Sequence, residues 1–112
     1  MITLEQGMIV LVPFPYSDLS NFKVRPALVV SNKHFRGHDA IFCAITSKTS
    51  KGNEISFSNE NLEKGQLPVT SYVKAGKVFT LEKSLIKKIV AKISAEKIKE
   101  VAVELAKILK PD

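Results

Sequence analysis

Short apolar runs separated by polar, turn-rich stretches fill most of the chain before residue 94. Runs rich in β-branched side chains predict three strands, at Met8–Val12, Val24–Ser31 and Ala40–Thr46. We expect Pro13 and Pro15 to end the first run. Pro26 favours a strand start or a bulge over a fully paired central position. The third run is almost wholly apolar, which predicts burial on both of its faces.

The middle of the chain carries weaker strand signals. Alternation of apolar and polar positions predicts four further short strands, at Glu54–Phe57, Ser71–Val73, Lys77–Leu81 and Ile89–Ile93. Gly76 predicts a turn between the second and the third of these. The segment Ser58–Pro68 is polar and contains Gly65, so we expect a loop there.

The apolar period becomes helical near the C-terminal end. Apolar residues recur at helical spacing up to Leu109, and Ser94 is suited to cap the first turn. Glu96 lies in that first turn, where the helix dipole favours an acid. With Pro111 just beyond, these signals predict one helix at Ala95–Leu109. Several short strands and then one amphipathic helix indicate a single, mainly β domain over residues 1–112. We expect a small, strongly curved barrel or sheet with the helix packed on it.

Composition excludes several classes of protein. The chain has 112 residues, of which 45% are apolar and 25% charged, so it is an ordinary globular protein and not a disordered one. One cysteine cannot form an internal disulfide, and with two histidines it leaves a zinc site short of ligands. No apolar run approaches the roughly 20 residues that span a bilayer, and residues 1–7 do not resemble a signal peptide. We therefore expect a reduced, soluble, cytoplasmic protein with no membrane association, metal or cofactor.

The net charge of +6 is unevenly distributed. Residues 69–112 hold ten of the 17 basic residues but only five of the 11 acidic ones. Between Lys74 and Lys92, six lysines face only Glu82. A basic stripe of this kind attracts polyanions, with solubility as the alternative explanation.

The chain has only two arginines, Arg25 and Arg36, and a guanidinium can hold a phosphate bidentately. Arg25 lies where a polar loop meets a strand, and Thr46 ends the next strong strand, followed by Ser47 and Lys48. If the two strands are neighbours, the start of one and the end of the next share a rim. These groups would then form a set of phosphate ligands. A surface salt bridge for Arg25 and an ordinary strand position for Thr46 are the alternatives.

Other reactive side chains have simpler explanations. His34 and His38 could act as acid and base in a ribonuclease, but they lie in a polar, glycine-containing connection that favours exposed loop positions. Cys43 lies within an apolar run and is interpreted as a core residue. Three aromatic residues flank the first loop and could stack on unpaired bases or pack in the core: Phe14, Tyr16 and Phe22.

Several segments resemble the MazF/PemK family of bacterial toxins. They are Gly7–Pro15, Lys23–Ser31, Cys43–Ser47, Leu67–Val73 and Phe79–Leu81, which follow in the family's order over nearly the whole chain. The most specific part is the Arg25-Pro26 pair after a turn-rich loop, followed by the strand end Ile45-Thr46-Ser47.

The resemblance implies an SH3-like barrel with a C-terminal helix, assembled as a homodimer. It also implies a type II toxin that is paired with an antitoxin and cleaves single-stranded RNA without a metal. We expect that antitoxin to be a small acidic protein encoded by an adjacent gene. By position, Arg25 resembles the family's catalytic arginine and Thr46 its catalytic Thr/Ser, and Pro15–Lys23 resembles the mobile loop over the RNA. The RNA-binding candidates are Ser17, Asp18, Lys23, Ser47, Lys48, Lys74 and Lys77.

Two positions depart from the family pattern. Met8 stands where an acid commonly follows the first glycine, and Gly76 where several members carry a carboxylate. The general base is therefore open, with Glu82 and Asp18 as the nearest acids in the sequence. These departures favour an alternative function: a non-nucleolytic toxin that poisons a protein such as gyrase, or an inactive RNA-binding relic.

Overall fold

The computed structural model describes residues 3–14, 23–49 and 52–112 of the chain. Within these residues the strands are β1 (Met8–Phe14), β2 (Lys23–Val29), β3 (Asp39–Thr46), β4 (Glu54–Phe57), β5 (Leu62–Gly65), β6 (Ser71–Glu82) and β7 (Lys88–Ile93). The helices are two short 3-10 helices, η1 (Asn59–Asn61) and η2 (Lys83–Leu85), and the α-helix α1 (Ala95–Leu109).

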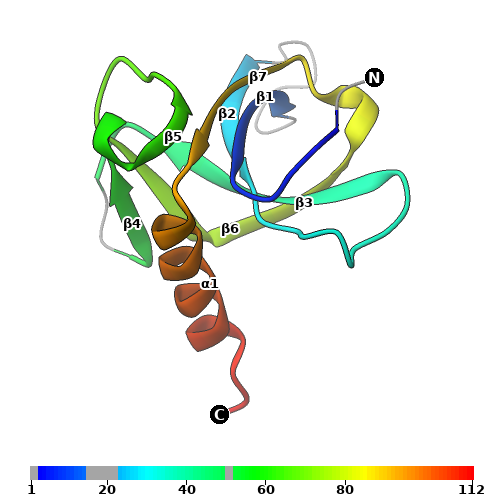
Figure 1. The fold of residues 1–112 in the computed structure, drawn as a ribbon. Coiled ribbons are helices and arrows are strands. Elements are labelled where there is room, and N and C mark those ends of the chain that lie inside the picture. The colour runs from blue at the N-terminus through cyan, green and yellow to red at the C-terminus, as the bar shows by residue number, and fades with distance from the viewer. Residues whose placement is uncertain (1–2, 15–22, 50–51) are drawn as a thin grey trace.

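These strands form one antiparallel sheet in the order β4-β6-β3-β2-β1-β7-β5. The sheet curls into a half-barrel, and α1 lies against it near β4 and β6 (Figure 1). The prediction of a mainly β fold with a C-terminal helix is confirmed. The curled sheet also agrees with the SH3-like barrel that the resemblance implies.

Each face of the sheet has its own apolar core. What we call the inner core includes the buried residues Val10, Val12, Phe14, Ala27, Val29, Ala40, Phe42 and Ala44. What we call the outer core packs against α1 and includes Ile9, Leu28, Cys43, Ile45, Phe57, Val73, Ile93 and Val101. Successive residues of β3 alternate between the two cores, which confirms that this strand is buried on both faces.

Helix α1 has the predicted boundaries and the predicted cap. The Lys97 N–H donates to the Ser94 hydroxyl over 3.3 Å. Val101 is buried in the outer core, and Ile98 packs against that core. Gly7 has φ +94°, and a Cβ there would collide with the Ile98 side chain, so the chain enters β1 pressed against the helix. Among the residues that the structure describes, no helix is long and apolar enough to cross a membrane.

The prediction of two strands around a turn at Gly76 is wrong, because β6 is one strand of 12 residues. Its register with β3 shifts between the pairs Ala44–Lys74 and Cys43–Val78. Residues 75–77 are therefore extra residues on β6, and they form a bulge that we call the β6 bulge. The glycine marks this bulge and not a turn.

Two further boundaries differ from the prediction. The segment 58–68 is not only loop, because it contains η1 and the edge strand β5, which pairs with β7. Strand β5 is mostly exposed and polar, so alternation cannot reveal it. Strand β1 continues through Pro13 to Phe14, where it pairs with β2 alone and a missing N–H is tolerated. As expected from Pro26, β2 pairs with β3 only from Ala27 onward.

Candidate functional site

The candidate site lies where the start of β2 meets the end of β3. The two strands pair antiparallel over three residue pairs, of which Ala27 opposite Ala44 is the one nearest this rim. Continuing the same register by two residues brings Arg25 opposite Thr46. The expectation that these strands are neighbours is confirmed, and the two predicted catalytic residues come to one rim.

Arg25 and Thr46 continue the inner face of the sheet. Because side chains alternate along a strand, Arg25 shares a face with Ala27, and Thr46 shares a face with Ala44. Both alanines are buried in the inner core, as is Val12, the register partner of Arg25 in β1. The apolar inner face thus gives way to polar groups at this rim.

Two further strands extend the rim. Tyr72 of β6 is the register partner of Thr46, and Ser56 of β4 is the register partner of Tyr72. Register partners project to the same face of a sheet. We call the resulting line of Arg25, Thr46, Tyr72 and Ser56 the rim row. Tyr72 is missing from the predicted site residues because its place depends on how β6 pairs with β3, which one strand's own pattern cannot show.

A second row lies two residue pairs further into the sheet, on the same face. Lys74 of β6 is half-buried and lies opposite Ala44 on one side and Glu54 on the other. By alternation it shares the face of the rim row, where its ammonium group adds positive charge. Glu54 contributes a carboxylate to the same face.

Glu82, one of the two acids named as the nearest candidates for the general base, does not lie at this rim. Glu82 is the register partner of Asp39, at the opposite end of β3 from Thr46. Seven residues of strand separate Asp39 from Thr46, which is roughly 23 Å at about 3.3 Å per residue. The other predicted base, Asp18, lies outside the described residues.

Hydrogen bonding leaves both main side chains open to a ligand. The Lys48 N–H donates to the Thr46 Oγ1 over 3.2 Å, so the hydroxyl proton remains to be donated elsewhere. Arg25 is exposed and has no hydrogen bond or ion pair with any residue that the structure describes. The surface salt bridge considered for Arg25 is therefore not found among these residues. Its guanidinium group is accessible to solvent and could therefore bind an anion.

Most other RNA-binding candidates surround this rim. Three are exposed and lie at the start of β2 or just after β3: Lys23, Ser47 and Lys48. Lys77 is exposed within the β6 bulge, next to the second row. The remaining candidates fall in the segment 15–22, outside the described residues: Ser17 and Asp18, with the aromatic Tyr16 and Phe22.

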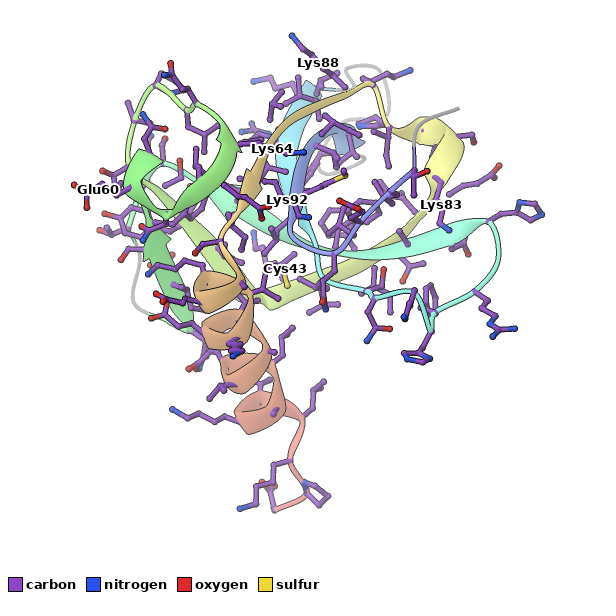
Figure 2. The ribbon with its side chains drawn as sticks, viewed as in Figure 1. Cys43, Glu60, Lys64, Lys83, Lys88 and Lys92 are labelled. Carbon is purple, nitrogen blue, oxygen red and sulfur yellow. The ribbon has the colours of Figure 1, made fainter. Side chains whose placement is uncertain are left out.

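The remaining reactive residues lie away from the rim. His34 and His38 are exposed on the connection between β2 and β3, at the opposite end of β3. Cys43 is buried in the outer core, and this burial raises the pKa of its thiol to about 11, so it stays protonated (Figure 2). Its interpretation as a core residue is confirmed. No group of three or more His, Cys, Asp or Glu gathers as a metal site within the described part of the chain.

Comparison with protein families covers nearly the whole chain, the rim row included. Residues 5–109 match the model of PemK-like, MazF-like toxins of type II toxin–antitoxin systems. The chain belongs to this family. Its PemK/MazF membership confirms the resemblance found in the sequence, and with it the assignment as a toxin of a toxin–antitoxin pair.

Solved structures share the fold of this PemK/MazF chain from end to end. An endoribonuclease from a mycobacterial species, solved with its cognate antitoxin, has a TM-score of 0.77 at 18% identity, covering 98% of this chain and 99% of that one. MazF from Deinococcus radiodurans has a TM-score of 0.75 at 23% identity, with 99% and 100% covered. A MazE–MazF structure from that organism has a TM-score of 0.74 at 21% identity and full coverage of both chains. Comparison with curated proteins gave no match.

The two departures from the PemK/MazF pattern have distinct surroundings. Met8 packs against the inner core, and its sulfur accepts a hydrogen bond from the Glu5 N–H over 3.3 Å. Gly76 is exposed in the β6 bulge, and a Cβ there would meet no other atom within 4 Å. A thioether against the core and an open glycine therefore stand where the resemblance leads us to expect acids.

Proposed function

We propose that this toxin is an endoribonuclease that cleaves single-stranded RNA, mRNA included, in the cytoplasm. The observation that supports the proposal is the β2–β3 register, whose last pair, Ala27 and Ala44, lies two residues from Arg25 and from Thr46, with exposed lysines around that rim. The similar mycobacterial protein is described as an endoribonuclease, which supports the same activity here.

The proposed reaction is an internal transesterification of the RNA. The substrate's own 2′-hydroxyl oxygen attacks the adjacent phosphorus, and the bond from phosphorus to the 5′-oxygen of the next nucleotide breaks. The 2′-hydroxyl gives up its proton, and the departing 5′-oxygen gains one. The products are a 2′,3′-cyclic phosphate and a 5′-hydroxyl. Because the RNA supplies the nucleophile, we propose no metal or cofactor.

Arg25 has the chemistry to stabilise the transition state. Negative charge grows on the non-bridging oxygens as phosphorus becomes five-coordinate, and a guanidinium that the bound phosphate holds in place there would be worth roughly 3–4 kcal/mol, by analogy with one oxyanion-hole donor. Arginine stays protonated up to a pKa above about 12, so it is a poor proton-transfer group. Lys74, on the same face, would add positive charge to the bound phosphate.

Thr46 would position the phosphate, since its hydroxyl accepts from the chain and has a proton left to donate. The proton on the 2′-hydroxyl needs a separate acceptor. Glu54 lies two strands and two residues from Thr46, roughly 12 Å away at the Cα, and could act only through intervening water. Alignment of the nucleophile in line with the leaving oxygen supplies further acceleration.

The test is direct cleavage of a long RNA by the purified protein in EDTA. We expect fragments with 2′,3′-cyclic phosphate and 5′-hydroxyl ends, and their loss in Arg25→Ala with folding intact. Thr80→Ala is a matched surface control, because Thr80 is exposed on β6 near the far end of β3. Cleavage retained by Arg25→Ala would overturn the assignment of this residue.

A non-nucleolytic toxin is the second candidate function. It is favoured by Met8 and Gly76, which leave two expected acids out of the site. The same assay separates the two functions. Growth arrest together with intact RNA would support poisoning of a protein target, and an inactive RNA-binding relic would produce neither cleavage nor arrest.

We also propose a homodimer and an acidic antitoxin as partners. The last turns of α1 expose Val103, Ile108 and Leu109, which a second subunit could cover. The chain's basic surface suits an acidic, initially disordered antitoxin tail. Light scattering of the free protein tests the dimer. An adjacent gene for a small acidic protein that co-purifies with the toxin tests the partner.

A further inference from the structure

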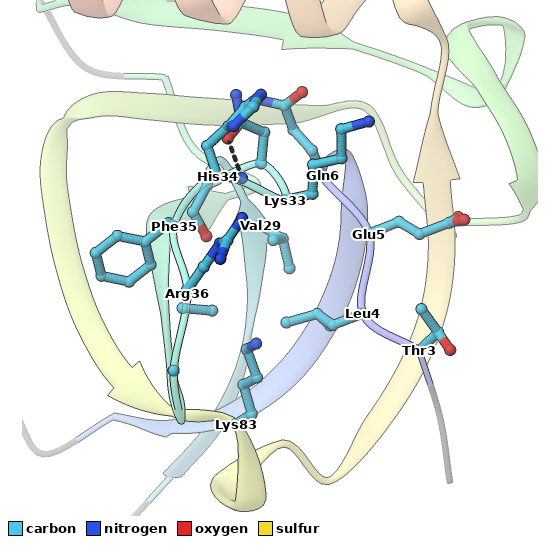
Figure 3. A pocket seen from close by; sticks show the side chains of 14 residues that line it. Thr3, Leu4, Glu5, Gln6, Val29, Lys33, His34, Phe35, Arg36 and Lys83 are labelled. Carbon is cyan, nitrogen blue, oxygen red and sulfur yellow. Dashed lines mark hydrogen bonds between the residues drawn. The ribbon is translucent and has the colours of Figure 1, made fainter.

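A cavity lies at the end of the curled sheet opposite Arg25 and Thr46. It has a volume of about 760 Å³ and is bounded by the residues before β1, the connection between β2 and β3, and η2 (Figure 3). Its accessible apolar lining includes the half-buried Leu4 and the exposed Phe35, while Val29 and Ala40 behind them are almost fully buried. Because Ala40 and Thr46 stand at opposite ends of β3, the two sites are roughly 20 Å apart along the strand.

Three basic side chains line this cavity: Lys33, Arg36 and Lys83. Figure 3 shows Arg36 and Lys83 projecting into the same opening from different elements. None of the three has an ion pair with any residue that the structure describes. The carboxylate among the lining residues is that of Glu5, which points away and binds Lys92 over 2.9 Å.

Backbone contacts hold the elements that carry these cations. The Lys83 N–H donates to the His38 carbonyl over 2.7 Å, which ties η2 to the connection between β2 and β3. Within that connection, Asn32 accepts from the His34 N–H at its side chain over 2.9 Å and from the Phe35 N–H at its carbonyl over 3.1 Å. Two like charges directed into one opening repel each other, so an anion between them is favoured.

We propose that this cavity binds a phosphate group of the RNA strand that is cleaved at the rim row, together with the nucleotide that carries it. The inference rests on the proposed function and extends it to a second contact on the same strand. Arg36 and Lys83 would hold the phosphate, and the apolar lining would receive the base. A nucleotide joins an anion to a flat apolar group in one unit, which matches cations set beside an apolar wall. The volume lies within the range of small-ligand pockets.

The test measures binding of a fluorescent 16-nucleotide RNA whose 2′-hydroxyls are all methylated, so that it cannot be cleaved. The double variant Arg36→Gln/Lys83→Gln should bind roughly a hundredfold more weakly, since it loses two charge-assisted hydrogen bonds that are each worth about a factor of ten or more. The slope of log affinity against log salt should also fall in magnitude, by about 0.7 for each phosphate that the variant no longer neutralises. Lys99→Gln/Lys110→Gln removes the same charge from exposed residues of α1 and its end, and should leave both quantities nearly unchanged.

Two further probes identify the source of the phosphate. If the double variant binds the RNA normally but fails to bind adenosine monophosphate, the cavity serves a free nucleotide, and the proposed contact with the RNA strand is overturned. If binding of the methylated RNA and binding of adenosine monophosphate are both independent of Arg36 and Lys83, the proposal is overturned. It is also overturned if only an acidic peptide depends on them. Because the methylated RNA reports binding alone, a failure of cleavage would not affect this result, and a failure here would leave cleavage at the rim row standing.

Discussion

Polar side chains lie near both ends of β3, but strands carry them at one end, and a connection and a 3-10 helix carry them at the other. At one end, Arg25 and Thr46 belong to neighbouring strands, each two residues beyond the pair Ala27–Ala44. At the other end, Arg36 and Lys83 come from a connection and a 3-10 helix that are tied by one backbone hydrogen bond. Strands hold atoms at defined separations, which a reacting phosphate requires, whereas loops tolerate adjustment, which suffices for binding. From this difference we expect RNA to be cleaved at the end with Arg25 and Thr46 and only to be bound at the end with Arg36 and Lys83.

Removing an arginine from each end should give the largest contrast. We expect Arg25→Ala to lower kcat roughly 10²–10³-fold, because its charge acts on the transition state. Arg36→Ala should act mainly on KM, since its interaction with the RNA is the same before and during reaction. Steady-state and single-turnover cleavage of one labelled RNA measure the two quantities. An equal loss of kcat in both variants would remove the distinction between the two ends.

Thr46→Ala should lower kcat about 10–100-fold, because it removes a positioning hydroxyl but no charge. Thr46→Ser keeps the hydroxyl and should recover most of the activity. Thr80→Ala, at the far end of the sheet, should stay within about twofold of the unchanged protein. The same cleavage assay applies, and similar losses in Thr46→Ala and Thr80→Ala would argue against a specific role at the rim.

Tyr72 tests whether the rim row also binds a base. Tyr72→Ala should weaken binding of the methylated RNA about tenfold, within the range for the loss of one stacked base. Tyr72→Phe keeps the ring and should bind within about twofold of the unchanged protein. If Phe binds as poorly as Ala, the hydroxyl and not the ring interacts with the RNA.

Gly76→Glu asks whether the open glycine limits the reaction. Gly76 has neither a positive φ nor a neighbour that a Cβ would meet, so the substitution should fold normally. We expect a several-fold increase in kcat that appears as pH rises through the pKa of the new carboxyl group, as for a general base. Gly76→Gln has the same shape without the charge and should show no such pH dependence. A flat pH profile in both variants would place the general base elsewhere.

The smallest expected effect is on stability, at the edge of the cavity that Arg36 and Lys83 line. The hydrogen bond from Lys92 lowers the pKa of Glu5 below its ordinary value of 4.5, with the charge of Lys92 as the next cause. The contribution of the pair is therefore present above pH 4.5 and is lost as pH falls through the lowered pKa. Urea unfolding of Glu5→Gln should show a slightly lower midpoint than the unchanged protein at pH 6 and no difference near pH 2. A difference that persists at pH 2 would assign the effect to packing.

Local pattern was sufficient for much of the fold. The apolar period, Ser94 and Pro111 predict α1 to the residue, and β-branched runs locate the first three strands within a few residues. Strand β5 is not predicted because it is a mostly exposed edge strand, and such a strand does not need the alternating apolar positions that reveal strands in a sequence. The prediction divides β6 into two strands at Gly76, because a glycine in a bulge and a glycine in a turn cannot be distinguished in the sequence.

The site was predictable only as far as neighbouring strands allowed. Arg25 and Thr46 could be brought together because sequential strands tend to pair. Tyr72 and Glu54 could not, since their positions depend on β6 lying between β3 and β4, a pairing between strands distant in sequence. Arg36 stood out in the sequence only as the second of two arginines. The cavity it lines needs residues from three separate elements.

The β6 bulge has a consequence for engineering and for natural variation. Its three extra residues are an odd number, so the odd and even positions of β6 exchange faces on crossing it: Lys74 shares a face with Ala44, and Phe79 with Phe42. Each half of the strand is thus aligned by its own partners, independently of the other half. A residue inserted beside Gly76 should lengthen the bulge without displacing either half. This makes the bulge a suitable place to attach a spectroscopic probe close to the rim row.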